Sequence, residues 1–171
     1  KDKTLDYAMY NSFGANFNFT KGKHIIRPEV MFRQAGAKSD FEGTALSWKM
    51  NYIDVNFGYL YSMLKTDKFS ISPGVAVGAG YMLNGEQYIG ETRYTVSETQ
   101  KLKRFDFGVQ GITNFKAYLN ESFTISLEYR FGIGATQIEN DVNAQVSRNI
   151  YHSALLGFGI LLNKKSSTRY N

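Results

Sequence analysis

Apolar and polar residues alternate with a period of two along most of this chain. In residues 123–136 the apolar side chains fall on odd positions, and polar or small side chains fall on even positions. Successive side chains of a β-strand point to opposite faces, so the pattern predicts a ribbon with one apolar and one polar face. The run is much longer than an ordinary globular strand of roughly 5–6 residues. Long strands of this kind are typical of a transmembrane β-barrel.

The same period defines about seven segments bounded by turn residues, and we expect each of them to be a strand. The segments are residues 7–19, 24–37, 44–64, 69–83, 103–118, 123–136 and 149–163. Within the third, the apolar phase changes between Tyr52 and Ile53, which predicts a β-bulge there, because one extra residue reverses the faces. Pro28 and Pro73 each remove a ladder donor, so we expect irregular pairing beside both.

The connections alternate in length. Residues 20–23, 65–68 and 119–122 form short polar turns, 38–43 is an intermediate loop, and 84–102 and 139–148 are longer polar loops. Outer-membrane barrels have short periplasmic turns and longer outer loops. The predicted fold is therefore all-β, an antiparallel up-and-down transmembrane β-barrel over residues 1–163, followed by a polar C-terminal tail over 164–171.

The number of strands adds one expectation. A barrel whose chain starts and ends in the periplasm needs an even number of strands, whereas seven are visible. Residues 1–6 are too few to cross a membrane, which takes about 9–11 residues per strand. We therefore expect eight strands, the eighth preceding residue 7 and pairing between the strands at 7–19 and 149–163.

Alternation alone also fits a soluble lipocalin-like barrel that binds a small apolar ligand. The polar face favours the membrane, because it is rich in glycine, as at Gly74, Gly78 and Gly132. Glycine weakens a strand unless another group approaches closely, and a narrow lumen supplies such groups while a solvated surface does not. The soluble barrel stays as the alternative. The expected lipid-facing residues are Val75, Val77, Leu127, Ile133, Phe158 and Ile160.

Composition agrees with this picture. The mean hydropathy of -0.34 suits a barrel, in which only every second residue is apolar. No apolar run approaches the roughly 18–20 residues of a membrane-spanning helix. The chain has no cysteine, which excludes disulfides and cysteine-ligated metals. The net charge of +5 is modest, and aromatic and basic residues occupy opposite faces, which disfavours nucleic-acid binding.

The polar face carries charges of both signs in nearly equal number. A buried charge is very costly unless it is paired, and the interior of an eight-stranded barrel is just wide enough for its own side chains. We therefore predict a structural network of ion pairs that plugs the lumen; a proton or ion path is the alternative. Its members are Arg27, Glu29, Arg33, Asp54, Arg104, Asp106, Lys116, Glu128 and Arg130.

Candidate catalytic chemistry is sparse. An acyl-transfer site would need serine, histidine and a carboxylate within reach of one another. The only histidines are His24, beside a short turn, and His152, whose neighbour Ser153 points to the opposite strand face. Two histidines without cysteine do not make a conventional metal site. We expect no enzymatic activity, no metal and no cofactor.

Four blocks of sequence carry a family resemblance: residues 50–57, 69–78, 105–111 and 123–133. In this order they resemble the Bacteroidetes outer-membrane β-barrel family typified by PorT. The resemblance implies an eight-stranded barrel in the outer membrane of a Gram-negative bacterium, without enzymatic activity or cofactor. Some members of that family resemble secretion-system components. This chain departs from the family in two respects: the opening strand is not visible, and residues 164–171 follow the last strand instead of a terminal aromatic residue.

Together these observations predict a small non-enzymatic outer-membrane barrel with a plugged lumen. We expect it to be an accessory or structural subunit of a larger outer-membrane complex for secretion, transport or assembly. Its expected partners are outer-membrane lipid and other outer-membrane or periplasmic proteins, and not nucleic acid. Its export signal is expected to lie outside this chain.

Overall fold

A computed structural model describes residues 9–41, 44–95, 103–136 and 148–162. All regular elements in these ranges are strands of one antiparallel sheet. They are β1 (Ser12–Asn16), β2 (Phe19–Lys21), β3 (His24–Phe41), β4 (Thr44–Tyr61), β5 (Leu64–Lys65), β6 (Phe69–Ile89), β7 (Thr92–Thr95), β8 (Phe105–Tyr118), β9 (Phe123–Gly134) and β10 (Ile150–Ile160). No helix in these ranges has the length and hydropathy needed to span a membrane.

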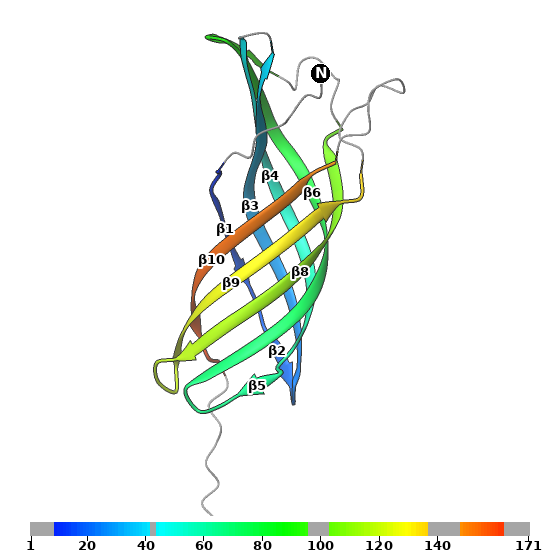
Figure 1. The fold of residues 1–171 in the computed structure, drawn as a ribbon. Helices are drawn as coiled ribbons and strands as arrows, with labels where there is room; N and C mark the ends of the chain where they lie inside the picture. Colours follow the sequence, from blue (N-terminus) through cyan, green and yellow to red (C-terminus); the bar gives the residue numbers. More distant parts are fainter. Residues whose placement is uncertain (1–8, 42–43, 96–102, 137–147, 163–171) are drawn as a thin grey trace, which may run out of the picture.

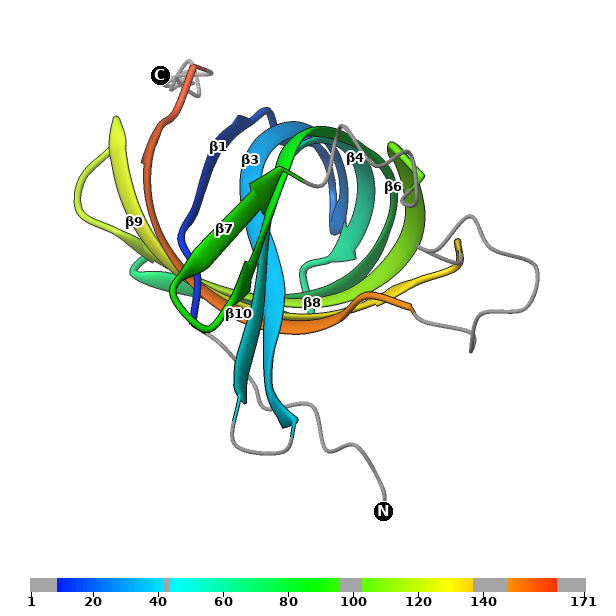
Figure 2. The same ribbon diagram turned by 90° about the horizontal axis from the view of Figure 1, so that it is seen from above.

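The sheet curves into a nearly closed barrel (Figures 1 and 2). Its strand order is β1-β3-β4-β6-β8-β9-β10, and every neighbouring pair is antiparallel. β2 and β5 continue β1 and β4 after short breaks, and β7 folds back on β6. The seven strands on this path correspond to the seven predicted segments, so the all-β up-and-down barrel is confirmed.

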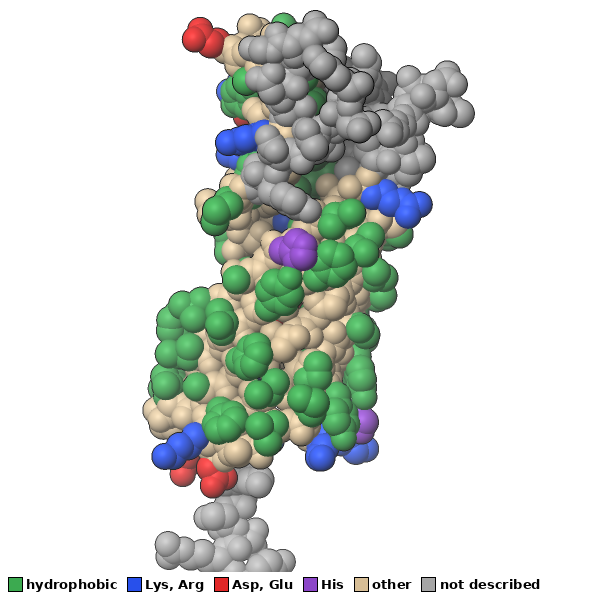
Figure 3. Space-filling view, in the orientation of Figure 1, with side chains coloured by type: hydrophobic (Ala, Val, Ile, Leu, Met, Phe, Trp, Pro, Cys, Tyr) green, Lys and Arg blue, Asp and Glu red, His purple; other side chains and the backbone are tan. Residues whose placement is uncertain are grey.

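Side chains alternate between the lumen and the outside along each strand. On β9, Leu127 points outward with 55% of its surface exposed, whereas its neighbour Glu128 points inward with 4% exposed. On the face drawn in Figure 3, the side chains coloured along the barrel wall are mostly apolar, and the charged side chains lie near its two ends. A soluble lipocalin-like barrel has the reverse arrangement, with an apolar interior. The soluble alternative is therefore wrong.

Strands extend into two of the predicted loops. β3 and β4 continue to Phe41 and Thr44, so the expected loop at 38–43 is mostly the end of a long hairpin. β6 extends to Ile89 and pairs with β7, so part of the expected loop at 84–102 is a second hairpin. These extensions rise above the barrel at the long-loop end (Figure 1), and we call them the raised sheet, residues 34–41, 44–51 and 84–95. Residues 96–102 and 137–147 lie outside the described part.

The β-bulge that the sequence predicts in β4 lies instead in the neighbouring strand, β6. The register between β4 and β6 does shift at Asn51/Tyr52, but the extra residue, Leu83, belongs to β6. β4 itself keeps one phase, and Met50 and Tyr52 are buried on the same face as Asp54. The apolar phase changes because the lumen is apolar at this level, where Met50, Tyr52 and Met82 form a buried cluster.

Both prolines lie opposite a break in the neighbouring strand. In an antiparallel ladder the N–H and C=O of a residue point to the same neighbour. The Pro28 carbonyl accepts from the Phe17 amide at 3.0 Å, between β1 and β2. The Ile71 carbonyl likewise accepts from Met63 at 3.0 Å, so Pro73, two residues on, faces the break between β4 and β5. The strand that neighbours each proline is therefore interrupted at the point where the proline supplies no N–H donor.

The barrel has two free edges, β1 with its continuation β2 on one side and β10 on the other. They end the strand order, and no pairing joins them among the described residues. Because six antiparallel steps separate β1 from β10, both strands run from the long-loop end to the short-turn end. We call the gap between these two edges the seam.

Candidate functional site

The candidate site is the lumen, whose buried side chains form layers along the barrel. Starting at the short-turn end, the lumen-facing residues of β3 are Ile25, Arg27, Glu29, Met31 and Arg33, and all are buried. An apolar cluster lies at each end of this stack of layers. At the short-turn end it consists of Ile25, Leu60, Ala76 and Ile112, and at the long-loop end of Met50, Tyr52 and Met82. Charged side chains occupy the layers between them.

The turn-side cluster consists of Arg27, Glu29, Glu128 and Arg130, two arginines and two glutamates on β3 and β9. The Arg130 guanidinium donates to both Glu29 oxygens at 2.6 Å, and its Nε donates to Glu128 Oε1 at 2.6 Å. Arg27 Nη1 pairs with the other Glu128 oxygen, Oε2. The four side chains therefore form one chain of ion pairs that links β3 to β9.

Amide side chains complete the hydrogen bonds of the turn-side cluster. Asn114 Nδ2 donates to Glu128 Oε2 at 2.8 Å, and Asn56 Nδ2 donates to Glu29 Oε1 at 3.0 Å. Arg27 Nε donates to Asn18 Oδ1 at 2.9 Å. As expected from strand pairing, Glu128 lies opposite Asn114 in the register of β8 and β9. Charges that are paired and saturated in this way can be buried at tolerable cost.

The loop-side cluster consists of Arg33, Asp54 and Asp106 on β3, β4 and β8. Arg33 Nε donates to Asp54 Oδ2 at 2.5 Å, and Nη2 lies 3.2 Å from Asp54 Oδ1 and 3.3 Å from Asp106 Oδ2. The rings of Tyr52 and Tyr151 lie 4.5 and 5.1 Å from the Arg33 guanidinium carbon. One arginine therefore serves two aspartates, and the cluster carries a net charge of about −1.

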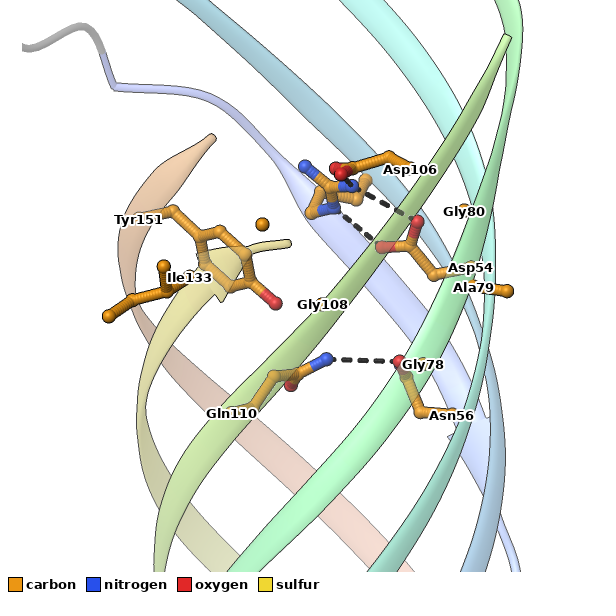
Figure 4. A pocket seen from close by; sticks show the side chains of 12 residues that line it. Asp54, Asn56, Gly78, Ala79, Gly80, Asp106, Gly108, Gln110, Ile133 and Tyr151 are labelled. Atoms are coloured by element: carbon orange, nitrogen blue, oxygen red, sulfur yellow. Dashed lines mark hydrogen bonds and ion pairs between the residues drawn. The ribbon is translucent and has the colours of Figure 1, made fainter. Parts of the chain in front are cut away.

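A small cavity adjoins the loop-side cluster, with Tyr151, Asp54, Asp106 and Gln110 around it (Figure 4). Its volume is about 20 Å³, room for about one water molecule. Arg33 Nη1 and Asp106 Oδ1 are buried here without a hydrogen-bond partner among the described residues. The loop-side cluster is thus less saturated than the turn-side cluster.

Two glycines allow lumen side chains to approach the backbone. A Cβ at Gly78 would overlap the Asn56 amide, which bridges Glu29 and Gln110. A Cβ at Gly132 would overlap the Tyr151 ring that stacks near Arg33. Close approach of another group is a typical reason for glycine inside a strand.

The structure places seven of the nine expected lumen residues in the two clusters; Arg104 and Lys116 lie outside them. Arg104 precedes β8, is exposed, and donates to the Tyr81 hydroxyl at 3.2 Å, so its assignment to the lumen is wrong. The alternation that assigns a face applies only inside a strand. Lys116 is half-buried on the lumen face of β8 and forms no ion pair with a described residue. The expected lipid-facing residues Val75, Val77, Leu127, Ile133, Phe158 and Ile160 are all exposed.

Several lumen contacts were not anticipated from the sequence. Asn18, Asn56 and Asn149 supply hydrogen bonds to the two clusters, and Tyr151 stacks beside Arg33. Asn56 has the same strand parity as the predicted lumen charge Asp54, and Tyr151 has the same parity as Ser153 on the polar face of its strand. That parity is the signal that could have identified both residues. Asn18 and Asn149 lie outside the strands, where parity assigns no face.

Both histidines lie on the outer face. His24 Nδ1 is 2.7 Å from the Tyr59 hydroxyl, and His152 Nδ1 is 2.6 Å from the Tyr129 hydroxyl. Both are exposed, and His152 and Ser153 point to opposite faces. Among the described residues, no group of three or more histidine, aspartate or glutamate side chains could hold a metal ion.

The raised sheet carries a separate charged group outside the barrel. On β6, Glu86 accepts from the Tyr88 hydroxyl at 2.8 Å and pairs with Arg93 of β7. The Tyr88 hydrogen bond, together with the Arg93 charge, lowers the pKa of Glu86 below its ordinary value of 4.5. This group links the two strands of the β6–β7 hairpin.

Comparison with known proteins gives one result on the family. A family model described as "Outer membrane protein beta-barrel domain" matches residues 3–138, which is most of the chain. No curated protein and no solved structure matches the chain.

Proposed function

This chain belongs to the outer membrane protein beta-barrel domain family, and on that premise we propose that it is a non-enzymatic accessory or structural subunit of a larger outer-membrane complex. The barrel lies in the outer membrane of a Gram-negative bacterium, with its apolar outer face against lipid. The observation that carries the proposal is the blocked lumen. The ion pairs of Arg27 and Arg130 link β3 to β9 across the interior of the barrel. A barrel filled by its own side chains offers no open conduit.

The long-loop end offers a surface for a partner protein. The raised sheet extends above the barrel and exposes Ile89 and Tyr94, with 40% and 48% of their surfaces accessible. Aromatic residues are enriched in protein interfaces. The resemblance to PorT-like barrels favours a complex that serves secretion, transport or assembly.

Electrical recording tests the plugged lumen. The purified protein, inserted into a planar lipid bilayer, is expected to show no discrete channel openings. The matched control is a double variant, Arg27→Ser with Arg130→Ser, which removes both arginines that cross the lumen. Regular single-channel steps from the unsubstituted protein would contradict a plugged lumen and favour an ion path.

Cross-linking in intact cells tests membership of a complex. A photoreactive residue replaces Tyr94 on the raised sheet, and a matched variant carries it at Val77 on the lipid-facing wall. We expect one companion protein, in near-stoichiometric amount, to be linked through position 94 but not through position 77. A protein that stays monomeric in mild detergent, with no cross-linked companion at position 94, would contradict the proposal.

A further inference from the structure

The turn between β2 and β3 is the most basic of the three short turns. It carries Lys21 and Lys23 and no acidic residue. The turn at 65–68 contains an aspartate as well as two lysines, and the turn at 119–122 contains a glutamate and no lysine. Lys21 and Lys23 are exposed, and neither forms an ion pair with a described residue. Positive charge without a neutralising partner in the described part of the chain is thus concentrated at this turn.

His24, the first residue of β3, adds a third nitrogen donor beside the two lysines. Lys21 and His24 are register partners, so they close a two-residue hairpin loop and their side chains share the outer face. His24 Nδ1 lies 2.7 Å from the Tyr59 hydroxyl. When Nδ1 accepts from that hydroxyl, Nε2 carries the ring hydrogen and is a donor. The exposed edge of the ring is then available to a ligand.

Two tyrosines of β4 hold these groups in place on the outer wall. The ring centroids of Tyr59 and Tyr61 lie 5.9 and 5.6 Å from that of His24. Lys23 Nζ lies 5.8 Å from the centroid of Tyr61, within the range of a cation–π contact. Figure 3 shows basic and histidine side chains next to one another at this end of the barrel. We call Lys21, Lys23, His24, Tyr59 and Tyr61 the basic patch.

The basic patch lies where the membrane meets water. Short turns of an outer-membrane barrel face the periplasm, and tyrosine is enriched at membrane–water interfaces. Next to the patch the wall becomes apolar: Phe19 is 63% exposed and Phe57 is 56% exposed. A molecule bound here therefore meets cations at one end and a hydrocarbon-facing wall at the other. A membrane lipid has this division, whereas a soluble anion uses only the polar half.

We propose that the basic patch binds the head group of an anionic phospholipid in the inner leaflet of the outer membrane. The two lysine ammonium groups and His24 Nε2 donate to the phosphate oxygens, as charge-assisted hydrogen bonds. The acyl chains lie along the wall beside Phe19 and Phe57. A zwitterionic lipid fits less well, because its own ammonium group lies close to Lys21 and Lys23. The site is separate from the raised sheet and does not depend on membership of a complex.

Native mass spectrometry of the protein in mild detergent, with equal amounts of phosphatidylglycerol and phosphatidylcholine added, tests the preference. We expect about tenfold more of the anionic lipid to be retained, since a basic side chain near a membrane surface favours anionic lipid roughly fivefold. The variant with Lys21→Gln and Lys23→Gln should lose most of this preference. The matched control, Lys65→Gln with Lys68→Gln, should keep it. No preference in the unsubstituted protein, or equal losses in the two variants, overturns the proposal.

Nuclear magnetic resonance of the two histidines locates the binding. In nanodiscs of phosphatidylcholine, replacing part of the lipid by phosphatidylglycerol should move the ¹⁵N resonance of His24 Nε2. His152 is the internal control, because it is also exposed and its Nδ1 lies 2.6 Å from the Tyr129 hydroxyl. Its resonance should stay unchanged.

The same spectra separate the sources of phosphate. Inorganic phosphate added to phosphatidylcholine nanodiscs should leave the His24 resonance in place, because it has no acyl chains to hold it at the wall. A shift with inorganic phosphate assigns the patch to a soluble anion and overturns the proposal. It is equally overturned if both histidines shift, if neither does, or if the His24 shift persists in the variant with Lys21→Gln and Lys23→Gln.

Discussion

The two charged clusters of the lumen use the same residue types but differ in balance. The turn-side cluster pairs two arginines with two glutamates, and side-chain amides fill the remaining hydrogen-bond positions. The loop-side cluster has one arginine for two aspartates, two atoms without a hydrogen-bond partner in the described part of the chain, and an adjacent cavity. The side chains of the turn-side ion pairs are 3–6% exposed and those of the loop-side ion pairs 7–10%.

The difference shows where the barrel tolerates incomplete pairing. A buried charge with no partner must be neutralised or hydrated. The turn-side cluster lies deep in the barrel and meets this requirement with protein groups alone. The loop-side cluster lies near the long-loop end, where one water molecule fits beside Arg33 and Asp106. We therefore expect the turn-side cluster to be the more sensitive of the two to substitution.

The largest expected effect comes from removing the central arginine of the turn-side cluster. Arg130→Met leaves Glu29 and Glu128 buried with fewer partners, and breaking such a network costs about 3–5 kcal/mol. The matched variant Arg33→Met leaves its aspartates beside the cavity, and we expect a smaller loss of about 1–3 kcal/mol. Urea unfolding in lipid vesicles, followed on unheated gels, measures both. Equal losses would remove the distinction between the clusters.

A charge on the other face of the same strand sharpens the comparison. Leu127→Arg puts a guanidinium against lipid, next to the buried Glu128, and should cost about 2–4 kcal/mol if residue 127 lies near the bilayer midplane. Phe123→Arg, at the short-turn end of β9, is the control and should cost about 0–1 kcal/mol. Folding yield into vesicles and urea midpoints measure both. If Leu127→Arg inserted as well as the unsubstituted chain, position 127 would not face lipid.

Replacing a carboxylate by the amide of the same shape compares how much one carboxylate of each cluster contributes to stability. Glu128→Gln weakens hydrogen bonds from Arg27, Arg130 and Asn114, and hydrogen bonds to charged groups contribute about 1.5–3 kcal/mol. Asp106→Asn removes one of two carboxylates that share Arg33, so we expect a change within about 0.5 kcal/mol. The same unfolding assay applies. A larger loss for Asp106→Asn would show that the second aspartate is needed.

The smallest expected effect is a response to pH in the raised sheet. Because the folded-state pKa of Glu86 is lowered, its carboxylate stabilises the hairpin fully above its ordinary value of 4.5. That contribution is lost as the pH falls through the lowered value. Hydrogen exchange of the β6–β7 amides should therefore quicken in acid, and the variant Glu86→Gln should lack this pH dependence. An unchanged response in that variant would assign the effect to another group.

Most of the barrel could be predicted from the sequence because a period of two determines which face each strand residue occupies. That rule places Arg27, Glu29 and Glu128 inside. It failed at Arg104, which lies just before its strand. The same rule gave the wrong face for Met50 and Tyr52, which are buried in the lumen. An apolar side chain indicates only that a position is away from water, and this holds both for contact with lipid and for burial in the lumen.

The pairing within the lumen could not be predicted. Which charges meet across a barrel depends on strand tilt and on the stagger between strands, and neither is visible in a local pattern. The sequence therefore gave no reason to pair Arg130 with Glu29 rather than with Asp54. The raised sheet was missed for a different reason, since its strands have no lipid-facing side that would impose a clean alternation.

The ion pairs between β3 and β9 also affect the order in which the barrel assembles. Arg27 and Glu128 are 101 positions apart in sequence, as are Glu29 and Arg130. Contacts of such long range form late, because a large loop must close first. Until β9 arrives, Arg27 and Glu29 lack these partners and keep water in the forming lumen. The partly built sheet is thereby held in a hydrated state, and its interior dries only in the final stage of folding.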